Sequence, residues 1–207
     1  MTLATEQLCG RLGLLPTCNI GDAMERLGVL DSRIKPVWSG GHLAGPAFTV
    51  WTRAGDNAFL HRALAEAAPG DVVVVNGQGD ESRALMGELM AARARNSGIA
   101  GFVIDGAVRD AVGLKRIGVP IFARATCAAG PYKHGPGALE LPIAVGGVAV
   151  LPGDIVVGDD DGVVIIPLAR AEEIAIAAEA IQQDETRRLS AIMAGAGGNQ
   201  EDACDAR

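Results

Sequence analysis

The chain has 207 residues, of which 49% are hydrophobic and only 3% aromatic, and it contains 28 glycines. A chain of this size can bury one core, and a core of small aliphatic residues with many tight turns is typical of an α/β enzyme domain rather than an antibody-like sandwich. The formal net charge of −7 excludes a general electrostatic attraction to nucleic acid or to anionic membranes.

Cysteine usage and the start of the chain bear on the cellular compartment. The four cysteines are scattered without C-x-x-C spacing, at Cys9, Cys18, Cys127 and Cys204. This argues against a zinc site and a disulfide framework, and it favours reduced thiols. The first residues show no basic segment followed by an apolar run, and no apolar stretch reaches about 18 residues. We therefore expect a cytoplasmic protein with no membrane partner.

The first part of the chain alternates between helical and strand patterns. Residues 1–30 have helical spacing, residues 45–53 are rich in strand formers, and residues 57–68 fit a helix. Residues 72–75 are four consecutive valines, which predict a strand buried on both faces. The polar residues 76–80 predict the loop that leaves this strand.

The next helix has two candidate starting points. Asp80 or Ser82 could begin it, but Gly87 would then lie inside the helix at a cost of about 1 kcal/mol relative to Ala. We therefore predict a helix that starts near Gly87 and stops at Gly98.

A second strand and helix follow. Residues 101–104 predict another buried strand, residues 105–107 a turn, and residues 108–117 a short helix that Gly118 ends. The next strand begins at residues 119–123.

The last third of the chain begins with short apolar runs separated by glycine-rich turns. Close spacing with such turns predicts antiparallel strands, at residues 143–145, 148–150, 155–157 and 163–166. Residues 168–193 have the pattern of a long amphipathic helix. Together the elements predict one α/β layered domain over residues 1–194 and a disordered polar tail over residues 195–207.

The strongest local signal for a functional site is the adjacent pair Arg109 and Asp110. The pair lies just beyond the predicted strand 101–104, and ligands in α/β proteins are commonly held at such strand ends. An Arg can bind a carboxylate through paired N–H bonds, and an Asp can hold a hard divalent cation. Most Arg-Asp pairs are surface or capping residues, so the pair alone leaves a structural role open.

A second candidate is the segment 87–90. If a helix begins there, its unpaired backbone N–H groups and its positive dipole end form a seat for a carboxylate. A glycine tolerated inside a longer helix is the alternative that the residues leave open.

Several longer stretches resemble the RraA-like family, which includes the 4-hydroxy-4-methyl-2-oxoglutarate and 4-carboxy-4-hydroxy-2-oxoadipate aldolases. They are GELM at 87–90, GIAGFVIDGAVRD at 98–110, GVPIF at 118–122, GGVAVLPGD at 146–154 and GDDDGV at 158–163. The similarity covers most of residues 17–190. It implies the three-layer β/β/α fold of swivelling type, and a homotrimer or dimer of trimers with active sites between subunits.

The resemblance also implies roles for individual residues. In the family's aldolases the position of Arg109 binds the substrate, and that of Asp110 binds Mg²⁺ or Mn²⁺. The pyruvyl carboxylate is contacted by backbone amides of the segment that matches Gly87, Glu88, Leu89 and Met90. Cleavage leaves the enolate of pyruvate, whose charge a metal stabilises as a Lewis acid while Arg109 supplies fixed positive charge.

Two acidic residues are further candidates for acid/base work. Glu88 could orient a metal-bound water or assist proton transfer, or it could be a solvated residue of the first helical turn. The family's aldolases also take an acidic residue from the C-terminal helix of the neighbouring subunit, and Asp184 or Glu185 lies in that region, of which we take Glu185 as the candidate. A single protein carboxylate, Asp110, is sufficient for Mg²⁺, which keeps several waters.

Other polar residues weigh less. A Schiff-base lysine would be a desolvated amine at the end of a buried strand. None of the three lysines, Lys35, Lys115 and Lys133, has that setting in the sequence. His61 and His134 receive less weight, because a histidine without a recognised motif is more often structural or exposed than catalytic. Cys127 lacks a convincing base partner. The acidic run 159–161 could suggest calcium, but a turn between strands explains it more simply.

We therefore predict a class II pyruvate aldolase, dependent on Mg²⁺ or Mn²⁺, with oxaloacetate decarboxylase side activity. Its substrate is a small oxo-acid whose identity depends on the pocket beyond the pyruvyl end. The alternative is the non-enzymatic branch of the family, which binds ribonuclease E and inhibits RNA decay. That branch needs no metal-binding acid, so Asp110 with Arg109 favours the enzyme. A methyltransferase is disfavoured because no Gly-rich nucleotide loop with a following acidic ribose ligand is evident.

Overall fold

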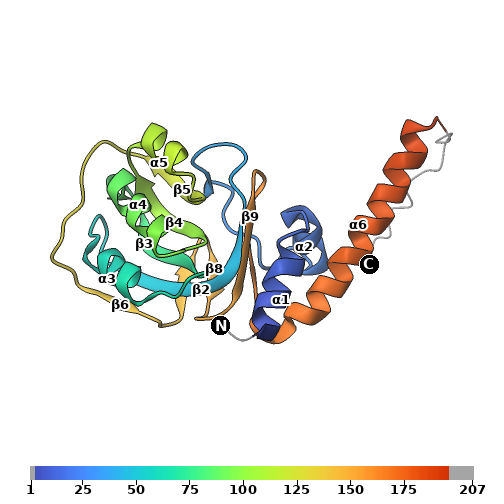
Figure 1. Ribbon diagram of the computed structural model, residues 1–207, viewed down its shortest axis with the longest axis horizontal. Coiled ribbons are helices and arrows are strands. Elements are labelled where there is room, and N and C mark those ends of the chain that lie inside the picture. The colour runs from blue at the N-terminus through green and yellow to red at the C-terminus, as the bar shows by residue number, and fades with distance from the viewer. Residues whose placement is uncertain (1–2, 196–207) are drawn as a thin grey trace.

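A mixed β-sheet forms the middle of the molecule in the computed structural model, which describes residues 3–195 (Figure 1). The strand order along the sheet is β1-β5-β4-β3-β2-β9-β10, and β6 pairs with the free part of β2. Strands β2 to β5 run parallel, whereas β1, β6, β9 and β10 are antiparallel to their neighbours. The bounds are β1 Lys35–Pro36, β2 Leu43–Thr52, β3 Val72–Met86, β4 Gly101–Val108, β5 Ile121–Thr126, β6 Gly137–Leu139, β9 Ile155–Asp159 and β10 Gly162–Ile166.

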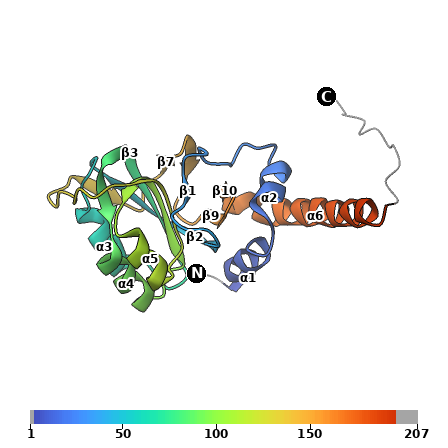
Figure 2. The same ribbon diagram turned by 90° about the horizontal axis from the view of Figure 1, so that it is seen from above.

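Helices cover one face of this sheet and a small hairpin covers the other, which gives the predicted three-layer β/β/α fold (Figure 2). The helical layer consists of α3 Ala58–Glu66, α4 Glu88–Asn96 and α5 Ala111–Ile117. The hairpin consists of β7 Ile143–Val145 and β8 Val148–Val150, paired antiparallel as the glycine turn predicts.

The valine run of β3 shows how one strand serves both cores. Val73 and Val75 pack into the core under the helical layer, while Val72 and Val74 pack into the core under the β7–β8 hairpin. Side chains alternate between the two faces of a strand, so a continuous apolar run is needed where both faces are covered. The prediction of a strand buried on both faces is confirmed.

The N-terminal and C-terminal helices form a third cluster on β9 and β10. These helices are α1 Leu3–Leu12, α2 Thr17–Ala23 and α6 Ala171–Met193, with a 3₁₀ turn at Leu168–Arg170 before α6. The long α6 projects away from the sheet on the side opposite α4 and α5 (Figures 1 and 2). None of the helices within residues 3–195 combines the length and apolar character needed to cross a membrane. The predicted tail lies outside the described residues except for Gly195.

The acidic run 159–161 forms the turn between β9 and β10, and its carboxylates bind protein donors. Asp159 accepts hydrogen bonds from the Thr17 backbone N–H (2.9 Å) and hydroxyl (2.6 Å), so it supplies the cap of α2 from a distant part of the chain. Asp160 accepts hydrogen bonds from the Ser39 hydroxyl and the Gly40 N–H. The interpretation as a turn agrees with these contacts.

Two predicted connections are wrong, because both segments continue strands. Residues 76–80 belong to the long β3, whose pairing with β4 is irregular from Asn76 onward. Residues 105–107, predicted as a turn, belong to β4, which continues to Val108 in register with Thr126 of β5. The turn preference of Asp105 and Gly106 is overridden by their pairing with β3, and Ala107 and Val108 pair with β5 as well. Arg109 and Asp110 therefore follow Val108, the last residue of β4, which pairs with β3 on one side and β5 on the other.

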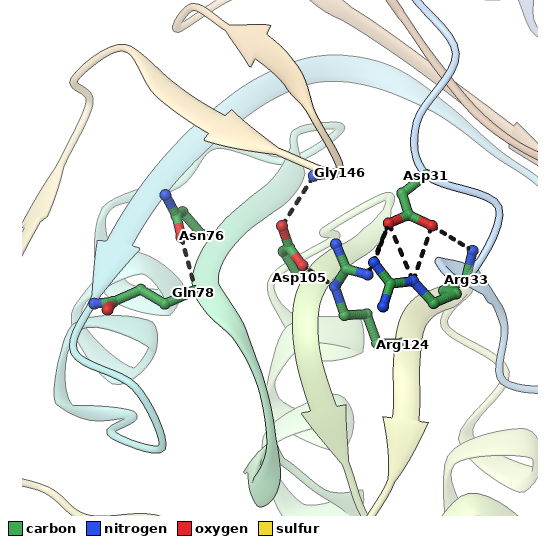
Figure 3. A network of polar contacts seen from close by, with 7 residues as sticks. All are labelled: Asp31, Arg33, Asn76, Gln78, Asp105, Arg124 and Gly146. Carbon is green, nitrogen blue, oxygen red and sulfur yellow. Dashed lines mark hydrogen bonds and ion pairs between the residues drawn. The ribbon is translucent and has the colours of Figure 1, made fainter.

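A buried ion pair explains why an aspartate occupies the interior of β4 (Figure 3). Asp105 is 7% exposed, and its carboxylate binds the Arg124 guanidinium of β5 and the Gly146 N–H of the β7–β8 turn (2.9 Å). Arg124 also binds Asp31 at 3.0 Å. The network joins the parallel strands β4 and β5 to the β7–β8 hairpin layer. The carboxylates of Asp105 and Asp31 hold the pKa of Arg124 above its usual range.

Replacing Asp105 with Asn is expected to lower the free energy of unfolding by about 3–5 kcal/mol, because it leaves the buried Arg124 charge without its main partner. Urea denaturation followed by circular dichroism measures this loss. The matched control is Asp184→Asn, because Asp184 pairs with Arg187 on the exposed surface of α6 and such pairs contribute about 1 kcal/mol or less. Equal losses for the two variants would contradict the assignment.

Candidate active site

The end of β4 places Arg109 and Asp110 beside the start of α4. The Arg109 N–H donates to the Met86 carbonyl at 2.9 Å, which fixes the chain where it leaves the sheet. Asp110 then takes a left-handed backbone conformation with φ 62°, which is uncommon for a residue other than glycine but tolerated by Asp. The turn points both side chains to the same place, and the Arg109 Nε lies 3.7 Å from the Asp110 Oδ2.

The Asp110 carboxylate contacts a helix other than its own. An Asp at the N-cap position usually accepts a hydrogen bond from the first turn of the helix that it begins, but Asp110 makes no such bond to α5. Its Oδ2 instead accepts the Glu88 N–H of α4 at 3.2 Å. The positive end of α4 therefore stabilises the charge of this carboxylate.

Gly87 makes this close approach possible. A Cβ atom at position 87 would lie 2.4 Å from the Asp110 Oδ2, closer than any real contact, and 3.1 Å from the Arg109 Cγ. The helix begins at Glu88 with Gly87 at its N-cap, as predicted. Glycine is required here for space and not for backbone freedom, because its backbone is extended (φ −152°).

The amides of residues 87–90 are partly engaged within the chain. The Glu88 N–H donates a hydrogen bond to Asp110, and the Met90 N–H donates to the Gly87 carbonyl at 3.1 Å. The Leu89 side chain is 81% exposed, whereas Met90 is buried. A ligand carboxylate at this helix end would therefore lie next to Asp110 and share the first turn with it.

The Glu88 carboxylate turns toward α5 and away from Asp110. It forms an ion pair with Arg116 and packs over Gly113, where a Cβ atom would lie 2.5 Å from the Glu88 Cδ. The Glu88 side chain is not part of the cavity lining described next.

A cavity of about 260 Å³ opens beside Arg109 and Asp110. The residues that line it come from α3, the end of β3, α4, the end of β4 and the loop before β6. They are Asn57, His61, Met86, Gly87, Leu89, Met90, Arg93, Arg109, Asp110, Pro131 and Lys133. Three of them are cationic and one is acidic, so the cavity favours a ligand with more than one negative charge.

Asp56 holds the loop that carries Pro131 and Lys133 over the cavity. Its buried carboxylate accepts three backbone N–H bonds, from Ala58 (2.9 Å), His134 (2.8 Å) and Gly135 (3.0 Å). Burial alone would raise the pKa of Asp56, but these bonds outweigh it and hold the pKa below its usual range. Asp56 thus joins the start of α3 to the loop as a charged anchor.

Sequence reasoning missed part of this lining. Asn57, Arg93 and Lys133 were not selected as site residues, and His61 was set aside as structural or exposed, yet all four line the cavity. Lys133 is exposed, so it is not the desolvated amine that Schiff-base chemistry needs. Partial desolvation at the cavity, together with the positive charges of Lys133 and Arg93, lowers the pKa of His61.

Glu185 lies elsewhere in the same chain. It is on α6, where it accepts a hydrogen bond from the Asn19 side chain of α2. Figure 1 shows α6 on the opposite side of the molecule from α4 and α5. One chain therefore does not bring Glu185 to the cavity.

The donor atoms around Asp110 suit a hard cation that keeps most of its waters. Within residues 3–195, no three His, Cys, Asp or Glu side chains gather into a cluster that could hold a metal by themselves. Asp110 is about half exposed, and the one oxygen that binds the Glu88 N–H is Oδ2. One carboxylate oxygen, waters and ligand oxygens are a donor set that Mg²⁺ accepts and zinc sites do not use.

The chain is similar to proteins of known family. Residues 17–165 match the RraA-like family, described as Aldolase/RraA. A protein of Halalkalibacterium halodurans whose name proposes a 4-hydroxy-4-methyl-2-oxoglutarate aldolase is 43% identical over 86% of this chain and 85% of its own length.

Two solved structures extend the likeness to the fold. An uncharacterized protein from Pseudomonas syringae is 28% identical, with a TM-score of 0.84 over 92% of this chain and 90% of its own. The RNA-processing inhibitor RraA from Thermus thermophilis is 33% identical, with a TM-score of 0.68 over 73% of this chain and 92% of its own. The family match covers well over half of the sequence, and the chain belongs to the RraA-like family.

Proposed function

We propose that the protein is a divalent-metal-dependent aldolase that cleaves a 4-hydroxy-2-oxo acid, such as 4-hydroxy-4-methyl-2-oxoglutarate or 4-carboxy-4-hydroxy-2-oxoadipate, and releases pyruvate. The observation that carries the proposal is the Asp110 carboxylate, held at the N-terminus of α4 beside Arg109 and at the edge of a cation-lined cavity. The aldolase name of the relative from Halalkalibacterium halodurans supports the same reaction class.

The side chains that line the cavity have different roles in the proposed reaction. Arg109 binds the pyruvyl carboxylate, and its fixed charge opposes the negative charge that develops as the carbon–carbon bond breaks. The buried side chains of Met86 and Met90 form an apolar floor that excludes water. Arg93 and Lys133 attract the far, second carboxylate of the substrate.

Asp110 would hold the metal, Mg²⁺ or Mn²⁺. A divalent ion bound there would supply Lewis-acid stabilisation of the negative charge on the pyruvyl oxygens. The same site would support decarboxylation of oxaloacetate as a side activity, since that reaction leaves the same three-carbon fragment.

Proton transfer needs an acid or a base. His61 lines the cavity, but neither of the two acidic candidates, Glu88 and Glu185, reaches it within one chain. Glu88 would have to leave Arg116 to serve. Glu185 could serve only from the α6 of a neighbouring copy. This fits the homotrimer or dimer of trimers with sites between subunits that the family resemblance implies, which we retain as part of the proposal.

Pyruvate release from 4-hydroxy-4-methyl-2-oxoglutarate, 4-carboxy-4-hydroxy-2-oxoadipate and oxaloacetate tests the proposal. A lactate dehydrogenase assay should detect pyruvate from at least one hydroxy acid in the presence of Mg²⁺. A chelator should abolish the release, and added Mg²⁺ should restore it. An unchanged rate of pyruvate release in the presence of the chelator would contradict a role for the metal in the reaction. Binding to ribonuclease E without any turnover would select the RNA-processing inhibitor instead.

A further inference from the structure

Asn57 has a buried oxygen atom that the described part of the chain leaves without a hydrogen-bond partner. The residue is 5% exposed and stands directly before α3, where it lines the cavity. Its Nδ2 donates to the Leu85 carbonyl at 3.0 Å, while its Oδ1 has no donor within residues 3–195. Buried polar atoms are almost always paired, so an orphaned acceptor beside a cavity indicates a missing donor.

The local structure keeps this oxygen free. An Asn at an N-cap position usually accepts an N–H bond from the first helical turn, but Asn57 makes no such bond. The Ala58 N–H donates instead to the carboxylate of Asp56, at 2.9 Å. The hydrogen bond to the Leu85 carbonyl also assigns the Nδ2 and Oδ1 atoms of Asn57, because only the NH₂ group can donate to a carbonyl.

The missing partner must be a hydrogen-bond donor, and a ligand in the cavity can replace a water at this position with a donor group of its own. A ketone, an ionised carboxylate and the pyruvyl end of a substrate can only accept. The hydroxyl group of a 4-hydroxy-2-oxo acid is a donor, and it is attached to the carbon whose bond to C3 breaks. Oxaloacetate in its keto form has no such group.

We propose that the Asn57 Oδ1 accepts a hydrogen bond from the substrate hydroxyl and thereby selects 4-hydroxy-2-oxo acids over acids that lack the hydroxyl. The inference rests on the proposed function and assigns its specificity to one residue. In the cleavage, the C3–C4 electron pair moves into the enolate of pyruvate and the O–H electron pair forms the new C4 carbonyl. Asn57 orients the hydroxyl for this step, and the proton leaves to a separate base because an amide oxygen does not take it.

The test compares two reactions in one variant, Asn57→Leu, which keeps the approximate size and shape of the side chain. With Mg²⁺, kcat/KM for 4-hydroxy-4-methyl-2-oxoglutarate is expected to fall about 10- to 100-fold, as for the loss of one buried hydrogen bond. Decarboxylation of oxaloacetate uses the same pyruvyl end and should stay near the wild-type value. The inhibition constant of 2-oxoglutarate, which lacks the hydroxyl, should also be unchanged.

Asn57→Asp supplies a second variant, because it retains the accepting oxygen and loses the bond to Leu85. It should retain more hydroxy-acid activity relative to oxaloacetate than Asn57→Leu does. An equal loss of both activities in Asn57→Leu, with weaker 2-oxoglutarate inhibition, would show a structural role and overturn the inference. Unchanged cleavage of the hydroxy acid would also overturn it. A wild-type enzyme that releases pyruvate from no hydroxy acid would instead reject the proposed function itself.

Discussion

Replacing Asp110 with Asn is expected to reduce pyruvate release about 100- to 1,000-fold, as the loss of one preorganised electrostatic group does in other enzymes. Asn has nearly the same shape, tolerates the left-handed backbone at φ 62°, and can still accept the Glu88 N–H. The variant therefore loses the charge that would hold a divalent ion and little else. The measurement is kcat/KM for the hydroxy acid across a titration of Mg²⁺.

Folding provides the first control for Asp110→Asn. Its free energy of unfolding should stay within about 0.5 kcal/mol of the wild type, because Asp110 is about half exposed. Glu66→Gln is a second control, since Glu66 pairs with Arg62 on the exposed side of α3, away from the cavity lining. A fully active Asp110→Asn protein would contradict the role assigned to this carboxylate.

The second large effect is expected from Gly87→Ala. The added methyl group would lie 2.4 Å from the Asp110 Oδ2 and 3.3 Å from the Arg109 Nε, so both side chains must move. A displacement of about 1 Å at a reacting centre can cost about 100-fold in rate, and we expect a loss of that size in kcat/KM. The backbone of Gly87 suits Ala, and the ends of Asp110 and Arg109 can swing into solvent, so stability should change little.

Gly10→Ala is the matched control for this substitution. Gly10 lies inside α1, and a Cβ atom added there would meet nothing within 4 Å outside the backbone of its own helix. Alanine should leave activity unchanged there and should raise stability slightly, because Gly in a helix interior is unfavourable. Retention of full activity by Gly87→Ala would show that the spacing between α4 and Asp110 does not matter for the reaction.

The elements that were predicted correctly are those in which local preference and tertiary structure agree. The valines at 72–75 form a strand because they are apolar on both faces, and Gly87 ends a strand and begins a helix because it is a poor helix-interior residue. Local preference and tertiary structure also agree at the glycine turn 146–147, which joins two antiparallel strands. In each case a short stretch of sequence contains the whole argument.

The predictions that failed depend on contacts between distant parts of the chain. Asp105 has the local preference of a turn residue, but pairing of β4 with its neighbours and the charge of Arg124 keep it in a strand. The cavity lining was incomplete for a similar reason. Asn57 and Lys133 line the same cavity because Asp56 and backbone hydrogen bonds join the segment before α3 to the 131–137 loop, and no local sequence pattern predicts such contacts.

The most direct test of the account is the exchange of the methyl protons of pyruvate in D₂O, followed by proton NMR. This exchange proceeds through the enolate and needs no knowledge of the natural substrate. We expect the wild-type protein with Mg²⁺ to replace the methyl protons with deuterium, and we expect neither the chelator-treated protein nor Asp110→Asn to do so. Exchange at an undiminished rate without the metal, or in Asp110→Asn, would contradict the claim that Asp110 holds an ion that stabilises the enolate.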